Sequence, residues 1–325
     1  MDSKSDIETL NELGKRYSQM QQEIGKVIVG QGHVVNSLLL SIFTGGHCLL
    51  VGVPGLAKTL MVNTVAKTMG LQFSRIQFTP DLMPSDITGS EILDDNRQFK
   101  FVKGPIFTNI LLADEINRTP PKTQAALLEA MQEKSVTIAG HSYALDAPFF
   151  VLATQNPIEQ EGTYPLPEAQ LDRFMMNIRL DYPSLEEEIS IVKNTTVDSN
   201  SEVREVMRAE EITAYQSAIR HIPVTDNVIS YAVRLATSTR PSANTATVAQ
   251  KYLSWGAGPR ASQYLVMGAK THAALNGKYS PDIDDVKAVA AEVLRHRMVR
   301  NYFAEAEGVS TDEVIEELMK EIKYN

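Results

Sequence analysis

Four short apolar runs, separated by helical stretches, constrain the fold of this 325-residue chain more than any other feature. Each run has the length of a strand. The runs cover residues 47–51, 73–78, 110–113 and 149–153. Strands that alternate with helices form parallel sheets, because each crossover connection carries a helix back over the sheet. The sequence therefore predicts an α/β fold with a parallel sheet and helices on both faces.

Two helices and two hairpins are predicted around these strands. Apolar residues recur at three- and four-residue steps over residues 7–28, and a second apolar helix over about 31–43 ends at Gly45-Gly46. Residues 79–108 are rich in Pro, Gly and Asp and contain two strand-like fragments on either side of a polar turn. Residues 134–148 show a second pattern of this kind. We interpret both segments as hairpins inserted into the α/β core.

The chain changes character after Tyr182-Pro183-Ser184. Six helical periods follow, and no strand is predicted among them. They cover about residues 185–194, 209–221, 225–239, 260–276, 282–298 and 310–323. Ser-x-x-Glu pairs that begin at Ser184 and Ser310 are typical of capping boxes. The predicted domains are an α/β core with an N-terminal helix over residues 1–183 and an all-helical domain over residues 184–325.

Charge and cysteine content exclude several classes of protein. Lys and Arg number 31 against 40 Asp and Glu, and the net charge of −9 disfavours a surface that binds nucleic acid throughout. Arg295-His296-Arg297 and Arg300 form a local basic patch, which is interpreted as the solvated last turn of a helix, with a subunit contact as the alternative. The single cysteine, Cys48, excludes an internal disulfide and a cysteine-rich zinc site. The most hydrophobic region, residues 38–55, is interrupted by Gly45-Gly46 and does not predict a membrane span. The N-terminus lacks the apolar core of a secretory signal, so a cytoplasmic protein is expected.

A glycine-rich loop directly follows the first predicted strand. It reads Gly52-Val53-Pro54-Gly55-Leu56-Ala57-Lys58-Thr59. A phosphate-binding loop needs inward-pointing backbone N–H groups, a helix N-terminus, a Lys for the β- and γ-phosphates and a hydroxyl for Mg²⁺. The usual pattern has Gly at the position of Ala57, and Ala is compatible with the start of a helix. The alternative interpretation is a simple Gly/Pro turn between a strand and a helix.

Polar residues end the next two buried strands as well. Asp114-Glu115 follows residues 110–113, and Asn156 follows the strand at 149–153. Because ligands of open parallel sheets bind at the carboxyl ends of the strands, we expect these side chains beside the loop. One carboxylate could hold Mg²⁺ and the next could deprotonate a water, while Asn156 could bind that water or a phosphate. Taken alone, the acids could be solvated strand ends and Asn156 a turn residue before Pro157.

Together these motifs resemble the AAA+ ATPases, and within them the MoxR family. The resemblance spans about residues 20–300, and Ala57 agrees with this family. Its motifs are the loop at 52–59, Asp114-Glu115-Ile116-Asn117-Arg118-Thr119-Pro120-Pro121-Lys122-Thr123-Gln124, Ala153-Thr154-Gln155-Asn156-Pro157 and Gly162-Thr163-Tyr164-Pro165-Leu166-Pro167-Glu168-Ala169-Gln170-Leu171-Asp172-Arg173-Phe174. The resemblance implies a P-loop core followed by a helical lid, and it implies ATP and Mg²⁺ as ligands.

The resemblance also implies a role for each matching residue. Lys58 and Thr59 would be the Walker A pair, with Thr59 and Asp114 holding Mg²⁺, Glu115 the catalytic base and Asn156 sensor 1. Arg173 belongs to the last of these motifs, whereas Arg260 and Val29-Gly30 lie outside them. Arg173 matches an arginine finger, Arg260 matches sensor 2, and Val29-Gly30 matches the segment that contacts adenine. Arg173 could instead form a local ion pair with Asp172 or Glu168, and Arg260 could act in its own subunit or the neighbour's.

The implied function is a MoxR-type ATPase that hydrolyses ATP to remodel, mature or load a cofactor into a protein partner. The family implies a ring, a hexamer, and partners with von Willebrand factor A domains. A magnesium-chelatase-like motor and a nucleic-acid motor are the alternatives, because related ATPases share both hairpins. The charge and the absence of Lys and Arg from residues 135–145 weigh against nucleic acid. A non-hydrolysing scaffold would not need Glu115, Asn156 and Arg173 together.

Overall fold

The computed structural model describes residues 3–93, 95, 97–159, 161–196, 202–242 and 247–322. The chain divides into two compact units. The first, which we call the sheet unit, comprises Arg16–Pro167 and Ile178–Thr213. The second, the helical unit, comprises Met1–Lys15, Glu168–Asn177 and Ala214–Asn325. The sequence predicted one domain boundary, between residues 183 and 184, whereas in the structure the chain passes between the two units more than once.

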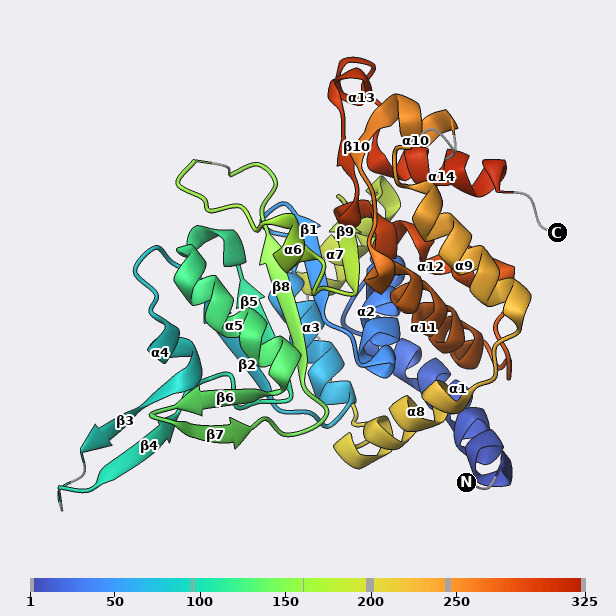
Figure 1. Ribbon diagram of the computed structural model, residues 1–325. Coiled ribbons are helices and arrows are strands. Elements are labelled where there is room, and N and C mark those ends of the chain that lie inside the picture. Colours follow the sequence, from blue (N-terminus) through green and yellow to red (C-terminus); the bar gives the residue numbers. More distant parts are fainter. Residues whose placement is uncertain are drawn as a thin grey trace. The chain divides into compact units, whose positions relative to one another are not determined.

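The sheet unit is built on a five-stranded sheet in the order β2-β5-β8-β1-β9 (Figure 1). Its strands are β1 (Cys48–Gly52), β2 (Phe73–Gln77), β5 (Ile110–Asp114), β8 (Phe150–Gln155) and β9 (Met176–Leu180). The pairs β2–β5, β5–β8 and β1–β8 are parallel. The four strands predicted from apolar runs and the parallel sheet are confirmed. The fifth strand, β9, was not predicted, although Met176, Ile178 and Leu180 alternate with Asn177 and Arg179 as in a half-buried strand.

Helices accompany the sheet, and α3 and α5 lie alongside its central strands (Figure 1). The helices of this unit are α2 (Gly32–Thr44), α3 (Lys58–Thr68), α4 (Pro84–Thr88), α5 (Pro121–Glu133) and α7 (Leu185–Thr195), with a 3-10 turn η1 (Ile116–Arg118). Two more, α1 (Ser3–Gly25) and α8 (Ala209–His221), contribute residues to both units. The buried residues of β1, β5 and β8 form the centre of the core, because these strands have neighbours on both sides.

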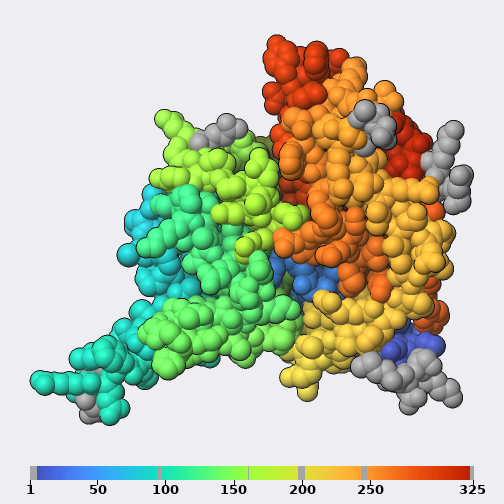
Figure 2. Space-filling model, viewed as in Figure 1, coloured from blue at the N-terminus to red at the C-terminus, as the bar shows by residue number. Residues whose placement is uncertain are grey.

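Both predicted hairpins are present. The first pairs β3 (Gly89–Leu93) with β4 (Phe99–Lys103), and the second pairs β6 (Ser135–Ile138) with β7 (His141–Ala144). Residues 94 and 96 of the first predicted turn lie outside the described residues. Phe101 of β4 stacks on Tyr143 of β7, with ring centroids 4.2 Å apart, and joins the hairpins. The β3–β4 hairpin stands clear of the body of the sheet unit in Figure 2.

The helical unit contains four of the six helices expected after residue 183, together with elements that were not expected. Its elements are α6 (Glu168–Leu171), α9 (Asp226–Ser238), α10 (Thr247–Tyr252), β10 (Leu253–Trp255), α11 (Pro259–Leu275), α12 (Ile283–Leu294), η2 (Arg295–Arg297), β11 (Val299–Arg300), α13 (Tyr302–Ala306) and α14 (Thr311–Glu321). The expectation of no strand is wrong, because β10 and β11 form a short antiparallel ribbon. Such brief strands carry too few residues for a recognisable alternation.

The basic run at 295–297 is not a solvated helical turn. Helix α12 ends at Leu294, and the run forms the 3-10 turn η2, in which His296 and Arg297 are buried. By contrast, the capping boxes at Ser184 and Ser310 are confirmed, since each Ser hydroxyl accepts the N–H of the Glu three residues later. None of the described helices has the length and apolar character needed to cross a membrane.

His47 precedes β1 and is buried inside the sheet unit. Its Nδ1 accepts the Val151 N–H at 3.0 Å, so its Nε2 carries the proton and donates to the Met131 carbonyl at 3.2 Å. This arrangement uses both ring nitrogens of a neutral imidazole. Burial is the main cause that lowers the pKa of His47 to about 4.

We predict that His47 makes the protein less stable in mild acid. Its folded pKa lies below the unfolded value of about 6.5, so the unfolded chain binds the extra proton between these two values. The free energy of unfolding should therefore fall as the pH drops through this window, by roughly 2 kcal/mol at pH 5 from this one group. Urea unfolding of the wild type and of His47→Gln between pH 7 and pH 5 measures the difference. A constant difference across that range would contradict the prediction.

Candidate functional site

The glycine-rich loop connects β1 to the N-terminus of α3, as predicted. Gly55 has a φ of +86°, a left-handed conformation that glycine adopts at low cost. Gly52 faces β9 so closely that an added Cβ would lie 2.7 Å from the Cβ of Leu180. The loop therefore depends on one glycine for its turn and on another for the packing of the two strands.

The sequence suggested that Ala57 lies at the start of the helix, but in the structure it lies outside the first helical turn. It is the residue before α3 and has a φ of +54°, in the left-handed region. An L-residue there carries a steric cost of roughly 1–2 kcal/mol compared with glycine. The loop thus keeps the conformation that a glycine would supply, although a methyl group is attached to it.

Lys58 is held within the loop that it follows. Its ammonium group donates a hydrogen bond to the carbonyl oxygen of Gly52, across the loop. Burial lowers the pKa of Lys58, while the charges of Asp114 and Glu115 act in the opposite direction. The lysine therefore lies within electrostatic reach of both carboxylates, which is the charge arrangement of a site for an anionic ligand.

The two predicted acids stand at the end of β5, linked by one hydroxyl from β8. Thr154 donates to Asp114 Oδ1 at 2.6 Å, and its oxygen accepts the backbone N–H of Glu115 at 2.9 Å. Glu115 has a φ of +57°, so the chain turns sharply between the two acids. Thr154 is fully buried and fixes the separation of the two carboxylates from the neighbouring strand.

The edge strand β2 supplies polar partners to both acids. Arg75 binds Asp114 Oδ2 with its Nη2 at 2.7 Å, and Gln77 donates to Glu115 Oε2 at 2.8 Å. Arg75 also donates to the Gln77 side chain at 2.8 Å. Arg118 of η1 contacts the same Glu115 oxygen at 3.1 Å. The carboxylates are thus held by cationic and amide donors from the strand beside them.

Asn156 follows β8, which lies between β5 and β1 in the sheet. In the parallel register Ala113 pairs with Ala153 and Val51 with Gln155, so the carboxyl ends of the three strands lie side by side. Asn156 is buried, and its Oδ1 accepts the N–H of Ile158 at 3.1 Å. Its Nδ2 is buried without a hydrogen-bond partner in the protein. A buried donor of this kind requires an acceptor, such as a water or a bound oxygen.

This donor set fits a phosphate and Mg²⁺. The Asn156 amide is an unpaired donor, the loop presents backbone N–H groups ahead of α3, and Thr59 and Asp114 offer the oxygen ligands that Mg²⁺ prefers. Among the residues that the structure describes, no group of three or more His, Cys, Asp and Glu side chains could hold a metal ion. Thr59 and Asp114 would supply two oxygen ligands, so an ion held there would take its further ligands from a phosphate and from water.

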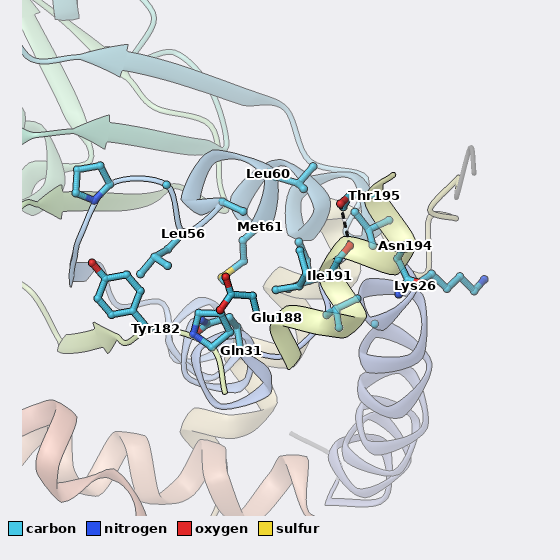
Figure 3. Close-up of a pocket in the computed structure, with 18 residues that line it drawn as sticks. Lys26, Gln31, Leu56, Leu60, Met61, Tyr182, Glu188, Ile191, Asn194 and Thr195 are labelled. Atoms are coloured by element: carbon cyan, nitrogen blue, oxygen red, sulfur yellow. Dashed lines mark hydrogen bonds between the residues drawn. The ribbon is translucent and has the colours of Figure 1, made fainter. Parts of the chain in front are cut away.

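A pocket of about 940 Å³ lies next to the loop within the sheet unit. It is lined by Val29, by loop residues 54–57 and by residues of α7. In Figure 3, Leu56 and Tyr182 lie at one end of the pocket, and Asn194 and Thr195 at the other. Gly30 is not part of this lining and has a φ of +69°. The structure thus brings the predicted Val29 and the loop to one cavity.

Arg173 and Arg260 belong to the helical unit. Arg173 is half-buried after α6, and Arg260 lies in the first turn of α11. Arg260 Nη1 contacts Asp172 Oδ2 at 3.2 Å, so Asp172, a sequence candidate for the partner of Arg173, binds the other predicted arginine. The two predicted arginines are therefore brought together through Asp172.

Comparison with known proteins agrees with this fold. Residues 47–176 match the ATPase family associated with various cellular activities (AAA), and residues 245–318 match the AAA lid domain. The parallel sheet, the phosphate loop and the helical C-terminal region therefore define an AAA ATPase with an α/β core and a lid.

Relatives over most of the chain give the family. Chaperone MoxR1 of Mycobacterium tuberculosis is 42% identical over 302 residues, which are 92% of this chain and 80% of MoxR1. Protein MoxR of Methylorubrum extorquens is 30% identical over 86% of this chain and 87% of its own. A crystal structure of a candidate ATPase from Cytophaga hutchinsonii has 45% identity and a TM-score of 0.92, and covers 99% of this chain and 98% of its own. The chain belongs to the MoxR family of AAA+ ATPases.

Several residues of the site were not anticipated. Thr154 stood inside a recognised motif without an assigned task, and Arg75 and Gln77 were assigned only to a strand. The signal for the latter two is their spacing, since polar residues two apart in a strand project from the same face. The pocket residues on α7 carry no sequence signal of their own, because they reach the loop only through the fold.

We predict that Thr154→Val destabilises the protein more than Thr154→Ser does. Valine keeps the shape but leaves the Glu115 N–H and one Asp114 oxygen without this partner. Leaving a buried polar group unpaired costs about 1–3 kcal/mol, and serine retains the hydroxyl. Scanning calorimetry of both variants measures the shift in Tm, which should amount to a few degrees for valine. Equal melting temperatures for the two variants would contradict the bridging role of the hydroxyl.

Proposed function

We propose that this protein binds ATP at the carboxyl edge of β1, β5 and β8 and hydrolyses it to ADP and phosphate. The observation that carries the proposal is the unpaired, buried Nδ2 of Asn156 at the same sheet edge as Lys58, Asp114 and Glu115. Membership of the AAA+ ATPases supports it. An anion-binding loop, metal-binding and water-orienting acids and a polar donor are parts that recur in nucleotide hydrolases.

Each residue then has a task in hydrolysis. The loop from Gly52 to Thr59 and the Lys58 ammonium bind the phosphates, and neutralise their charge. Glu115 orients a water molecule and takes its proton as the water attacks the γ-phosphorus. Asn156 Nδ2 donates to that water or to the γ-phosphate. The bond between the γ-phosphorus and the bridging oxygen breaks, and ADP leaves with that oxygen.

The nucleotide base is assigned to the pocket beside the loop. Val29 and Leu56 offer apolar surface to its ring, and Gly30 allows the left-handed turn that follows Val29. The polar groups of Asn194 and Thr195 at the far end are candidates for contact with the edge of the ring. In this assignment, the adenine nucleotide occupies the pocket whose lining extends from the loop to α7.

Mg²⁺ is proposed to bind at Thr59 and Asp114. When bound, the ion would offset negative charge on the β- and γ-phosphates. Thr154 orients Asp114 by donating to one carboxylate oxygen, and Arg75 holds the other. The carboxylate is thereby kept in one orientation at the sheet edge.

Two arginines complete the proposed machinery. Arg173 is the arginine finger that a neighbouring subunit receives at its γ-phosphate, where neutralising the transition-state charge is worth roughly 10³–10⁵ in rate in comparable enzymes. Arg260 is sensor 2. A finger supplied to a neighbour requires a head-to-tail contact between subunits, which forms either a closed ring or an open filament, and a hexameric ring is the assembly we propose.

The hydrolysis is proposed to drive a chaperone that remodels or matures a protein client. The resemblance to MoxR proteins favours a client with a von Willebrand factor A domain in the cytoplasm, and insertion of a metal or cofactor is one form that maturation could take. The β3–β4 hairpin exposes Ile92, Leu93 and Phe99, which is suitable surface for a protein partner. The net charge of −9 disfavours the alternative of a nucleic-acid motor. A magnesium-chelatase-like motor would share the same site.

Glu115→Gln tests the catalytic base. The variant should bind ATP as the wild type does and hydrolyse it about 10²–10⁴ times more slowly, because the amide cannot accept the proton. Equilibrium binding of a fluorescent ATP analogue and steady-state phosphate release measure the two effects. Glu317→Gln, an exposed glutamate in α14, is the matched control. Turnover at the wild-type rate in Glu115→Gln would refute the assignment.

A mixing experiment tests the arginine finger. Arg173→Ala alone should lose turnover, because no subunit receives a finger. Mixed with Glu115→Gln subunits, which keep Arg173 but lack the base, Arg173→Ala subunits should regain activity at their own intact sites. Phosphate release at several mixing ratios measures this recovery. A mixture as inactive as its two components would argue that Arg173 does not act across a subunit boundary.

The Glu115→Gln variant with ATP bound can also be used to test binding of a client protein. Purified von Willebrand factor A domain should be retained by this variant in ATP and released in ADP. Retention that does not depend on the nucleotide would count against an ATP-driven remodeller.

A further inference from the structure

Arg297 has a buried guanidinium group in which every N–H meets an oxygen. The side chain is only 2% exposed. Its Nε donates to Asp172 Oδ1 at 2.7 Å, its Nη2 to the carbonyls of Asp172 and Phe174 at 3.0 and 2.6 Å, and its Nη1 to those of Met175, at 3.1 Å, and Val293. These five contacts use all five donors that an arginine possesses.

Four of the five acceptors belong to the chain on either side of Arg173. Asp172 precedes Arg173 and contributes a carboxylate oxygen and its carbonyl, while Phe174 and Met175 follow it and contribute their carbonyls. One planar group therefore binds the backbone on both sides of Arg173. Its rigid fork fixes the relative positions of those oxygens, which a flexible ammonium group would not do.

Because the Arg297 charge is buried, its hydrogen-bond acceptors must be well placed. Burial lowers the pKa of Arg297, and the charge and hydrogen bond of Asp172 oppose that shift. A guanidinium taken out of water is tolerated only where its donors meet acceptors in good geometry. The conformation of residues 172–175 is thus tied to Arg297, because any other conformation would leave a buried charge without its acceptors.

The same cluster extends to Arg260. Asp172 Oδ2 accepts from Arg260 Nη1 at 3.2 Å, while Oδ1 is taken by Arg297. Tyr264, one turn after Arg260 in α11, places its ring 5.1 Å from the Arg297 guanidinium. Asp172 is therefore the chain neighbour of Arg173 and the hydrogen-bond partner of Arg260, and the buried Arg297 binds its second carboxylate oxygen.

We propose that Arg297 is a positioning residue that sets the backbone of Arg173 for ATP hydrolysis. This inference rests on the proposed role of Arg173 as a finger. Arg297 does not touch nucleotide in this scheme. Its defect should therefore appear in the site that receives Arg173, while the site of the same subunit keeps its own loop, acids and amide.

Arg295 offers a matched control from the same 3-10 turn. Its side chain is 9% exposed and makes two hydrogen bonds to Asp312, both at 2.9 Å, and one to the carbonyl of Asn177. None of these acceptors lies within residues 172–175. Arg295→Lys therefore removes a comparable buried guanidinium group but leaves the hydrogen bonds between Arg297 and residues 172–175 in place.

The test compares Arg297→Lys with Arg295→Lys in the full chain. Lysine keeps the charge but offers three donors on one nitrogen, so it cannot span both sides of Arg173. Because misplacing a catalytic group by about 1 Å costs roughly 10²-fold, we expect ATP turnover of Arg297→Lys to fall by about that factor with ATP affinity unchanged. Arg295→Lys should keep most of its turnover. Mixed with Glu115→Gln subunits, Arg297→Lys should regain activity, because its own sites then receive an intact finger.

Three different results would overturn either the inference about Arg297 or the proposed role of Arg173 on which it rests. Turnover of Arg297→Lys at the level of Arg295→Lys would show that the clamp is not needed. An inactive Arg297→Lys that mixing does not rescue, while Arg173→Ala is rescued, would show a general structural defect. Failure of both mixtures would refute the finger in trans and, with it, the proposed function of Arg173.

A second variant guards against misfolding of Arg297→Lys. Asp172→Asn keeps the side-chain shape and removes the charge that Arg297 and Arg260 share. It should lose turnover in the same direction and be rescued by the same mixture. Full activity of Asp172→Asn in unmixed form would count against the inference.

Discussion

The parallel register of β5, β8 and β1 is the constraint on which the rest of the site depends. It aligns Ala113 with Ala153 and Val51 with Gln155, so three strands end at one edge. The residues that follow those ends are the phosphate loop, Asp114-Glu115 and Asn156. A shift of one residue in a strand would turn its side chains to the opposite face. The spacing of the proposed catalytic residues is therefore a property of the sheet more than of any loop.

Charges at this edge are arranged so that each has a partner before any ligand binds. Lys58 is held by the carbonyl of Gly52, Asp114 by Thr154 and Arg75, and Glu115 by Gln77 and Arg118. An anion entering the loop would compete for these donors. The exception is Asn156, whose buried amide has no protein acceptor. The site is thus ordered in advance, with one donor left for the ligand or its water.

Local patterns were enough to predict the strands β1, β2, β5 and β8, both hairpins, the capping boxes and the motif residues. They succeed because apolar runs, turn residues and cap pairs act within a few positions of one another. They were not applied to β9, although its alternating apolar and polar residues are typical of a half-buried strand, and they failed for the β10–β11 ribbon. They also misplaced Ala57, because the left-handed turn before α3 is imposed by the loop as a whole.

The sequence alone determined the α/β class, the family and the identity of the residues at the sheet edge, because these depend on local pattern and motif order. Only the tertiary structure decided what the basic run at 295–297 does. From sequence it resembled an ordinary solvated turn, whereas in the fold Arg297 is buried against Asp172, Phe174 and Met175. Its partners lie more than 120 positions away in the chain, and no local pattern carries information on a contact closed over that distance.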